Sequence, residues 1–424
     1  MLKGIALFVC LLLVTFSSAR SQGETAVPFL LFTPSIEANG MGGIGTGLSP
    51  ENALAPYHNP GTLGLFRGFL SGGFYAPATN WLPLFQISDL KYSAWAVNAG
   101  VRLNDYLSLP FNLIVAAGYS RIDLNMGRFT ITGPTGPQPI GYFEPHESSS
   151  NETFAIGLGY IMRIGVGVTF KSIKSALSPV GTEAEQGLAT ASSSAIDYGF
   201  AVQLPVVEAI ENLAGVSLEV LPKIKPVFDV TFTSAKSNRG DPMVYVDAAQ
   251  ADPLPRLATL GLASELGVVS LLFGDEWKVA TFKISREAQQ VLVNRNPDGT
   301  WKYIDGTGDI SFADNVIGGK AGPKIYSRKG WQFQIAEALY LRGGSMDLPY
   351  LKCKTSGFGI QLSGLLKVLL ALAPEIREGT WVRDLAENFD IQYQTGSYTG
   401  TSSPIDDTNF KGFNIVLKKI PYVR

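Results

Sequence analysis

Much of this chain alternates between apolar and polar or small residues with a period of two, which is typical of β-strands with one apolar face. The clearest run follows Tyr92: Trp95, Val97, Ala99 and Val101 share one face, and Asn98, Gly100 and Arg102 share the other. Seven further clear runs lie at 109–119, 154–160, 164–170, 196–204, 228–232, 331–335 and 389–393. Five weaker runs lie at 68–75, 256–266, 277–284, 355–362 and 410–417, and a fourteenth strand is expected in the less regular region 214–221.

The length of these runs separates two all-β architectures, because the strands of a soluble sandwich also alternate. Many runs cover about 9–13 residues, enough for a tilted strand to cross a bilayer, whereas soluble strands typically have about 5–6. Aromatic residues also stand near the ends of runs, as expected for the interfacial girdles of a membrane barrel: Tyr92, Tyr119, Tyr160, Phe170 and Trp331. The pattern predicts an all-β, membrane-spanning antiparallel β-barrel, with about fourteen strands because single-chain barrels of this kind use even numbers.

The first residues have the pattern of a secretory signal peptide. Lys3 supplies a positive charge, Gly4–Phe16 is an apolar run too short to span a membrane, and Ser17-Ser18-Ala19 offers small residues for cleavage. We place cleavage after Ala19, with Ser21 as the alternative, and therefore expect an exported protein. Removal of residues 1–19 takes Cys10 away and leaves Cys353 as the sole cysteine, so an internal disulfide is excluded.

Residues 20–65 differ from the strands that follow, and we expect them to form a plug, or hatch, inside the barrel of residues 66–424. Six of the chain's 46 glycines lie between Gly40 and Gly61, together with prolines at 50, 56 and 60. Glycine permits positive φ and proline fixes φ, so a compact and irregular path is expected.

Three connections, at 127–151, 289–324 and 397–409, are rich in turn residues and are expected to be extracellular loops. About residues 365–388, leucines recur around charged residues, which predicts one or two short amphipathic helices between strands. They would pack against the barrel end or the lipid interface, or alternatively dock a partner. Glu337 interrupts an apolar face, so it lies beyond the bilayer edge or marks a register slip.

Composition and motifs exclude several functions. Only 17% of residues are charged, below the roughly 25% of soluble domains, and the net charge of −2 gives no nucleic-acid surface. Residues 40–45 match GxGxxG, but no strand precedes them and no βαβ unit follows. His58 and His146 are the only histidines and stand in unlike contexts, so no metal site is indicated. Asp298, Asp305 and Asp309 lack the spacing of an EF-hand and are more simply solvated turn acids. With no nucleophile-elbow motif, we expect neither an enzyme nor a cofactor.

The plug region resembles the start of PorV/PorQ-type proteins, a branch of the FadL-like outer-membrane barrels. The resemblance lies in Pro34, Ala38-Asn39-Gly40-Met41-Gly42-Gly43, Asn52-Ala53 and His58-Asn59-Pro60-Gly61. The leucine-rich helix and Phe389-Asp390-Ile391-Gln392-Tyr393 also resemble the late part of that group. Three departures are His58 in place of Trp, Gly61-Thr62 in place of a small Ala, and the C-terminal Tyr422-Val423-Arg424 in place of a terminal aromatic. The resemblance implies an outer-membrane barrel with a lumenal hatch, whose plug motif is Gly40, Met41, Gly42, Gly43, Asn59, Pro60 and Gly61.

Two functions then compete. A PorV-like protein would serve type IX secretion, with outer-membrane lipid, secreted cargo and a secretion translocon as partners. A FadL-like protein would be a passive channel for hydrophobic small molecules, and Met41, Ile44, Leu48 and Leu54 would line its lumenal pocket, unless they simply fill the barrel. The N-terminal motif favours the first.

Overall fold

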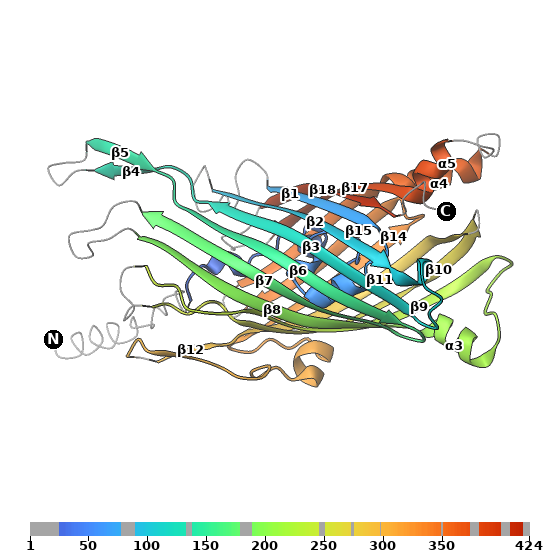
Figure 1. Cartoon of the computed structure of the whole chain (residues 1–424), viewed down its shortest axis with the longest axis horizontal. Coiled ribbons are helices and arrows are strands. Elements are labelled where there is room, and N and C mark those ends of the chain that lie inside the picture. The colour runs from blue at the N-terminus through green and yellow to red at the C-terminus, as the bar shows by residue number, and fades with distance from the viewer. Residues whose placement is uncertain are drawn as a thin grey trace, which may run out of the picture.

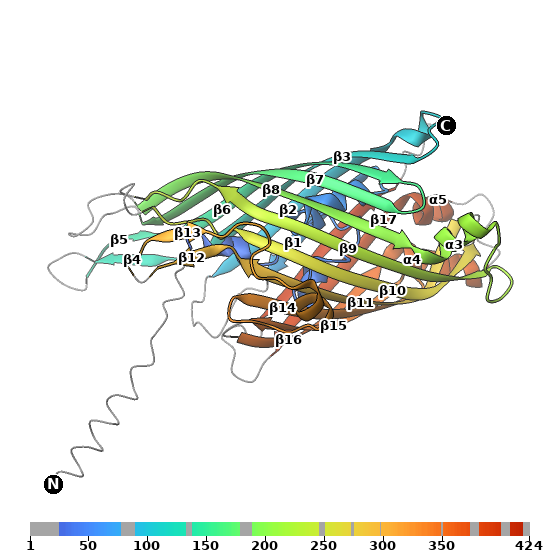
Figure 2. The ribbon, with the colours of Figure 1, turned by 90° about the horizontal axis from the view of Figure 1, so that it is seen from below.

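The chain forms a closed antiparallel barrel of fourteen strands, shown from two sides in Figures 1 and 2. The computed structural model describes residues 25–77, 90–132, 138–178, 189–245, 251–272, 275–296, 298–348, 351–373, 381–399 and 408–418. The barrel strands are β1 (Leu70–Pro77), β2 (Lys91–Arg102), β3 (Asn112–Asn125), β6 (His146–Gly159), β7 (Arg163–Ser178), β8 (Ala189–Pro205), β9 (Ile224–Gly240), β10 (Leu257–Leu272), β11 (Asp275–Val291), β14 (Ile325–Ile335), β15 (Leu339–Leu348), β16 (Leu351–Gln361), β17 (Phe389–Thr399) and β18 (Asn409–Leu417). Pairing of β1 with both β2 and β18 closes the barrel. The predicted fold class is therefore confirmed.

The alternating pattern explains which side of each strand faces outward. On β2, Trp95 and Val97 are exposed, whereas the intervening Ala96 and Asn98 are buried in the lumen. On β6, too, the large apolar residues Phe154 and Ile156 are exposed and the small Ala155 between them is buried. A continuous outer surface of exposed apolar side chains with no free strand edge is the structure that a bilayer requires of a spanning sheet. Among the described helices, none is long and apolar enough to cross a membrane.

The two ends of the barrel differ in their connections. At one end, called here the loop end, β4 (Phe129–Thr132) pairs with β5 (Pro139–Phe143), and β12 (Val293–Arg295) with β13 (Trp301–Tyr303). The connection that holds β12 and β13 also forms the π-helix η7 (Phe312–Ile317). At the other end, the turn end, residues 160–162 join β6 to β7 and residues 336–338 join β14 to β15. Short periplasmic turns and longer extracellular loops are usual in barrels of the outer membrane, so we expect the loop end to be the extracellular side.

The turn end also bears three helices, which Figure 1 shows at the right. Helix α3 (Val206–Ala214) follows β8, while α4 (Leu362–Leu372) and α5 (Trp381–Asn388) separate β16 from β17. The predicted amphipathic insertion is therefore present. Lys367 of α4 pairs with Glu337 at 2.7 Å, which fixes the helix to the β14–β15 turn. Glu337 thus lies beyond the end of its strand, as one of the two sequence-based interpretations required.

Residues 25–69 run through the lumen from the loop end to the turn end, where β1 begins; Figure 1 shows them inside the barrel in blue. This segment, the plug, contains η1 (Pro28–Leu31), α2 (Ile36–Gly40), η2 (Ala55–Tyr57) and η3 (Pro60–Leu65). Its first described contact is the Ala26 amide with the Pro253 carbonyl, and at its end the Phe69 amide bonds to the Leu417 carbonyl. The expected signal peptide lies outside the described residues.

Three sequence-based expectations were wrong in detail. The fourteenth strand is β15, not residues 214–221, which form the end of α3 and a loop. β15 was missed because Gly343, Ser345 and Asp347 follow Leu339 and Leu341 on its outward row and end the apolar pattern there. The predicted loop 127–151 contains β4, β5 and the first part of β6, whose serines alternate too weakly to indicate a strand. Tyr92 does not belong to a girdle, because its side chain is fully buried in the lumen.

Candidate functional site

The plug backbone lies directly against the barrel wall because glycines there lack a Cβ. A Cβ on Gly157 of β6 would lie 1.7 Å from the carbonyl oxygen of Gly64, and one on Gly344 of β15 would lie 2.5 Å from the amide nitrogen of Gly42. Glycine weakens a strand and often marks a close approach of another backbone. The small residues on the inward rows therefore serve the plug, and β6 and β15 lie on opposite walls of the barrel.

The predicted plug motif is divided between these two walls. Residues Gly40–Gly43 lie against β14–β16, where the Gly42 amide donates to the Thr355 hydroxyl at 2.8 Å and that hydroxyl donates to the Gly40 carbonyl at 3.0 Å. Gly42 and Gly43 both have positive φ, so glycine is needed at this turn. On the other side, Asn59 caps η3 through the Gly61 amide at 2.9 Å and donates to the Phe200 carbonyl of β8 at 2.9 Å. The two halves of the motif thus attach the plug to both walls.

A single carboxylate holds the middle of the plug. Glu287 on β11, 1% exposed, accepts hydrogen bonds from the Gly45 amide at 2.9 Å, the Thr46 amide at 2.8 Å and the Thr46 hydroxyl at 2.9 Å. Its other oxygen accepts from the Gln289 amide group at 3.0 Å. Next to it, the Arg328 guanidinium donates to the Gly43 carbonyl. Hydrogen bonds to ionised groups are stronger than neutral ones, so Glu287 is a latch between plug and wall.

At the loop end the lumen is apolar. Phe29 and Leu30 of η1 are buried in a cluster with inward side chains of several strands and of the β9–β10 connection. We call this cluster the apolar compartment. Its wall residues include Tyr75, Tyr92, Ile122, Ile173, Leu254, Tyr398 and Phe410. Their rings are in contact, with centroids 5.6 Å apart for Tyr75 and Tyr92 and 4.5 Å apart for Tyr398 and Phe410. The plug fills this compartment with its own apolar side chains.

Beside the apolar compartment, a buried ion pair lies against the plug. Lys171 of β7 and Asp197 of β8 are 2.7 Å apart and at most 1% exposed. The Lys171 ammonium also lies 4.6 Å from the ring centroid of Tyr57 in the plug. The neighbouring His58 has a buried Nε2 atom with no hydrogen-bond partner among the described residues. Burial, with Arg328 and Lys171 nearby, lowers the pKa of His58 to about 3, so the docked imidazole is neutral.

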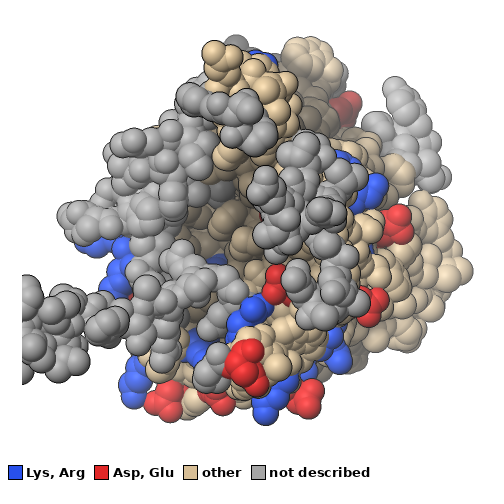
Figure 3. All heavy atoms as spheres, turned by 90° about the vertical axis from the view of Figure 1, so that its left-hand side faces the viewer, with Lys and Arg blue, Asp and Glu red and all other residues tan. Residues whose placement is uncertain are grey.

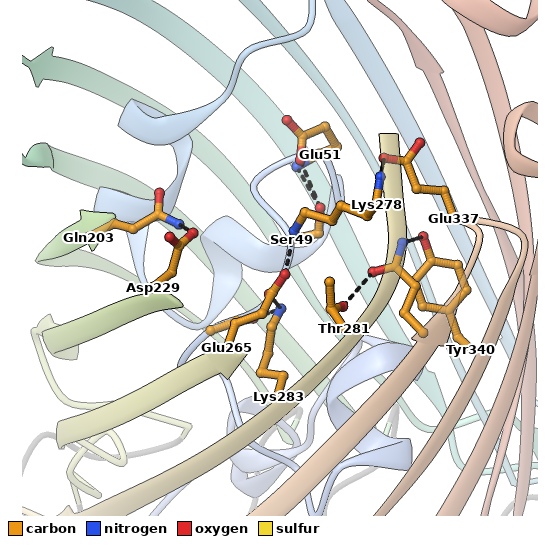
Figure 4. A network of polar contacts seen from close by, with 12 residues as sticks. Ser49, Glu51, Gln203, Asp229, Glu265, Lys278, Thr281, Lys283, Glu337 and Tyr340 are labelled. Carbon is orange, nitrogen blue, oxygen red and sulfur yellow. Dashed lines mark hydrogen bonds and ion pairs between the residues drawn. The ribbon is translucent and has the colours of Figure 1, made fainter. Parts of the chain in front are cut away.

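Toward the turn end the lumen opens into a charged cavity of about 610 Å³. Figure 4 shows part of its wall, where Lys283 pairs with Glu265 at 3.2 Å and Gln203 donates to Asp229 at 2.9 Å. Lysines, arginines and carboxylates of α2, α3, α4 and the surrounding strands complete the lining. The apolar compartment thus lies at one end of the lumen and the charged cavity at the other, and the plug runs from one to the other.

The four residues proposed for an apolar ligand pocket are buried but do not form one pocket. Met41 and Leu48 pack together with Ala38 and Ala55, inside the plug itself. Leu54 belongs to the apolar compartment, and Ile44 is buried away from both clusters. The sequence-based site missed Phe29 and Leu30, although the apolar run 27–32 soon after the predicted cleavage site could have indicated them. Among the described residues, no group of three His, Cys, Asp or Glu side chains could hold a metal ion.

Comparisons with known proteins add little to this picture. No protein-family model and no curated protein sequence matches the chain. Among solved structures, it is similar to the toluene transporter TodX of Pseudomonas putida, with 10% identity over 90% of this chain and 96% of that one and a TM-score of 0.36. The CymD monoaromatic hydrocarbon channel has 10% identity, coverage of 89% and 94%, and a TM-score of 0.37. A FadL homologue of Pseudomonas aeruginosa has 9% identity, coverage of 91% and 97%, and a TM-score of 0.35. Similarities this low support no functional conclusion, and the resemblance to PorV/PorQ-type proteins stays a prediction.

Proposed function

We propose that this protein is an outer-membrane channel that takes up small hydrophobic molecules passively at its loop end, and that the plug closes it in this conformation. The observation that carries the proposal is the apolar compartment. Channels for water-soluble molecules have polar lumens, whereas here aromatic and aliphatic side chains line the lumen behind the long loops. Phe29 and Leu30 occupy the place that a small hydrophobic molecule would take.

The part of the plug that fills this compartment is held differently from the rest. The Ala26 amide bonds to the Pro253 carbonyl at 2.9 Å, and the Tyr57 and Tyr92 hydroxyls donate to the carbonyls of Leu30 and Phe32. Among the described contacts, no carboxylate latch like that at Gly45 and Thr46 binds residues 26–31. This part of the plug is therefore held mainly by apolar burial, which a hydrophobic molecule bound in the compartment could replace.

Backbone strain points to the same segment. Val27 has φ 45° and ψ 55°, a left-handed conformation that is uncommon for a β-branched residue and costs of order 1–3 kcal/mol. Release of residues 26–32 from the compartment would relieve this strain. A hydrophobic molecule that replaces Phe29 and Leu30 would recover the apolar burial that their departure loses.

The test is binding of a monoaromatic molecule to a variant with a shortened plug side chain. Phe29→Ala removes a fully buried ring and leaves an apolar cavity, and such cavities bind benzene-sized ligands. We expect the purified Phe29→Ala protein to bind toluene, measured by NMR chemical-shift changes, and to admit it faster into proteoliposomes. Phe66→Ala is the matched control, because Phe66 is equally buried but packs at the turn end with Leu63, Ala116 and Ala155. Equal toluene binding by both folded variants, or by neither, would refute the proposal.

The PorV-like role in type IX secretion remains a second candidate, supported by one observation. The plug from Gly40 to Phe66 is attached to both walls and closes the lumen, as suits a barrel that acts through its loop-end surface rather than as a channel. A pull-down from the native outer membrane separates the two functions. Recovery of secreted proteins that share a C-terminal β-domain would favour secretion, and bound apolar small molecules without a protein partner would favour uptake.

A further inference from the structure

The outer wall of the barrel is as asymmetric as its lumen. Near the turn end the outward residues are apolar and exposed, such as Leu158, Leu204 and Ile415. Near the loop end, each of eight strands has a lysine or arginine among its outward residues, next to the apolar surface. These residues are Lys91, Arg121, Lys174, Lys236, Arg286, Lys329, Lys354 and Lys411. The described outward rows of the barrel strands hold three carboxylates at that level: Asp123, Glu152 and Asp347.

This belt of cations lies where the lipid-facing surface meets the loops. Figure 3 looks onto the loop end and shows lysine and arginine side chains around its rim, together with carboxylates. Basic residues at the edge of a bilayer are attracted to anionic headgroups by about 1 kcal/mol each. The asymmetry therefore matches a leaflet with phosphate groups at the loop end.

One part of this belt forms a groove in the outer wall, across β16, β17 and β18. The groove has a volume of about 410 Å³, and its lining includes Ser356, Phe358, Tyr393, Thr395, Ser397 and Lys411. Across the strands, Thr395 is paired directly with Phe358 on one side and with Lys411 on the other. Aromatic, hydroxyl and ammonium groups are thus adjacent in the groove.

Polar groups are unusual in the outward row of a membrane strand, because a hydroxyl in hydrocarbon needs a hydrogen-bond partner. Ser356 and Ser397 satisfy each other at 2.8 Å. The Thr395 hydroxyl and the exposed Lys411 ammonium have no hydrogen-bond or ion-pair partner among the described side chains. Directly toward the turn end, the rings of Tyr393 and Phe413 lie 5.1 Å apart on the lipid-facing side. The groove is therefore polar toward the loop end and aromatic toward the turn end.

We propose that this groove binds one phosphate-bearing lipid of the leaflet at the loop end. The Lys411 ammonium and the hydroxyls of Thr395 and Ser397 bind the headgroup phosphate, and an acyl chain lies along Phe358, Tyr393 and Phe413. Both ends of the groove then match the two parts of the ligand. This proposal does not depend on the uptake of hydrophobic molecules through the lumen.

The test is lipid binding by the purified, delipidated full-length protein in detergent, measured by native mass spectrometry. The probe is lipid A with its phosphate groups, and diacylglycerol is the uncharged comparison. Lys411→Gln should weaken binding of lipid A about tenfold or more, because it removes a hydrogen bond to a charged group. Thr395→Val keeps the shape of the side chain and should weaken binding about fivefold, in line with the loss of one neutral donor.

Lys174→Gln is the matched control, because Lys174 is an exposed cation of the same belt on β7, outside the groove. It should change lipid A affinity less than about twofold, because Lys174 is not part of the groove and would not contact the lipid bound there. Equal losses in Lys411→Gln and Lys174→Gln would overturn the groove in favour of the belt as a whole. Displacement of lipid A by inorganic phosphate at the same concentration would show that the chain binds free phosphate instead of lipid. If the Thr395→Val protein folds and binds lipid A with unchanged affinity, the proposed role of the Thr395 hydroxyl in phosphate binding is refuted.

Discussion

Substitution of Glu287 by alanine should release the plug without unfolding the barrel. In the native structure four hydrogen bonds end on this carboxylate, three of them from the plug residues Gly45 and Thr46. In Glu287→Ala the amides of Gly45 and Thr46 lose their partner while they stay in the lumen. Each buried donor left unpaired costs about 1–3 kcal/mol. Allowing for partial rehydration from the charged cavity, we expect the docked plug to lose about 3–4 kcal/mol.

A loss of this size raises the open population of the plug by about two to three orders of magnitude. Hydrogen–deuterium exchange read by mass spectrometry measures it directly, as faster exchange in peptides that cover residues 41–50. Peptides from β6 and β7 should exchange as in the unmodified protein, because their ladder hydrogen bonds do not involve Glu287.

The matched control is Glu147→Ala on β6. Glu147 is also a buried, inward carboxylate, but it accepts from the Ser175 hydroxyl of the neighbouring strand rather than from the plug. Exchange at 41–50 should not change in this variant. Equal acceleration in both variants, or protection at 41–50 that survives Glu287→Ala, would refute the assignment of Glu287 as the latch.

Two further predictions concern the fit and the charge of the plug. Gly157→Ala places a Cβ against the Gly64 carbonyl and should cost about 1–3 kcal/mol of stability, measured as a lower midpoint of thermal unfolding. Gly141→Ala in β5 is the control and should be near neutral, because the nearest atom to its added Cβ is 3.5 Å away. Equal midpoints for the two variants would contradict the close approach of plug and wall. Because the pKa of His58 is lowered to about 3 in the docked plug, a released plug takes up a proton below about pH 6.5 and the docked one does not. Docking should therefore weaken by about 1.4 kcal/mol per pH unit from pH 6.5 downward, measured by exchange at 41–50. His58→Gln should abolish this dependence, and an unchanged pH profile in that variant would assign it to another group.

The barrel was predictable from the sequence because the outward side chains of every strand contact lipid and must therefore be apolar. Trp95, Val97, Phe154 and Ile156 face lipid, so the chain repeats the same alternation strand after strand. β15 was missed because its outward apolar row is short, ending at Gly343 and Ser345 after Leu339 and Leu341. Its inward row follows a different rule: Gly344 is glycine because the plug backbone passes over it. A residue chosen for a contact distant in sequence gives no local signal.

The same reason explains what was missed in the lumen. Tyr92 looked like a girdle residue from its place near the end of a run, yet its ring packs edge-on against Phe32 of the plug, 5.8 Å away. The latch was equally hidden, since Glu287 stands 241 residues from Thr46 in the chain. The motif 40–43 and 59–61 did indicate the plug, because positive φ and helix capping are local requirements that glycine, asparagine and proline meet.

The polarity of the lumen and that of the outer wall are opposed along the same axis, and together they favour uptake from the loop end. Near the loop end the wall is cationic outside, and the lumen inside it holds the apolar compartment beside the buried Lys171–Asp197 pair. At the turn end the wall is apolar outside and charged inside. An apolar molecule that arrives at the loop end finds favourable burial only after it passes the loops, in the compartment that Phe29 and Leu30 fill. A polar solute could enter the charged cavity at the turn end, but the plug and the aromatic rings of the apolar compartment lie between that cavity and the loop end. Under the proposed function, the apolar compartment would accept small hydrophobic molecules in preference to ions and sugars when residues 26–32 move.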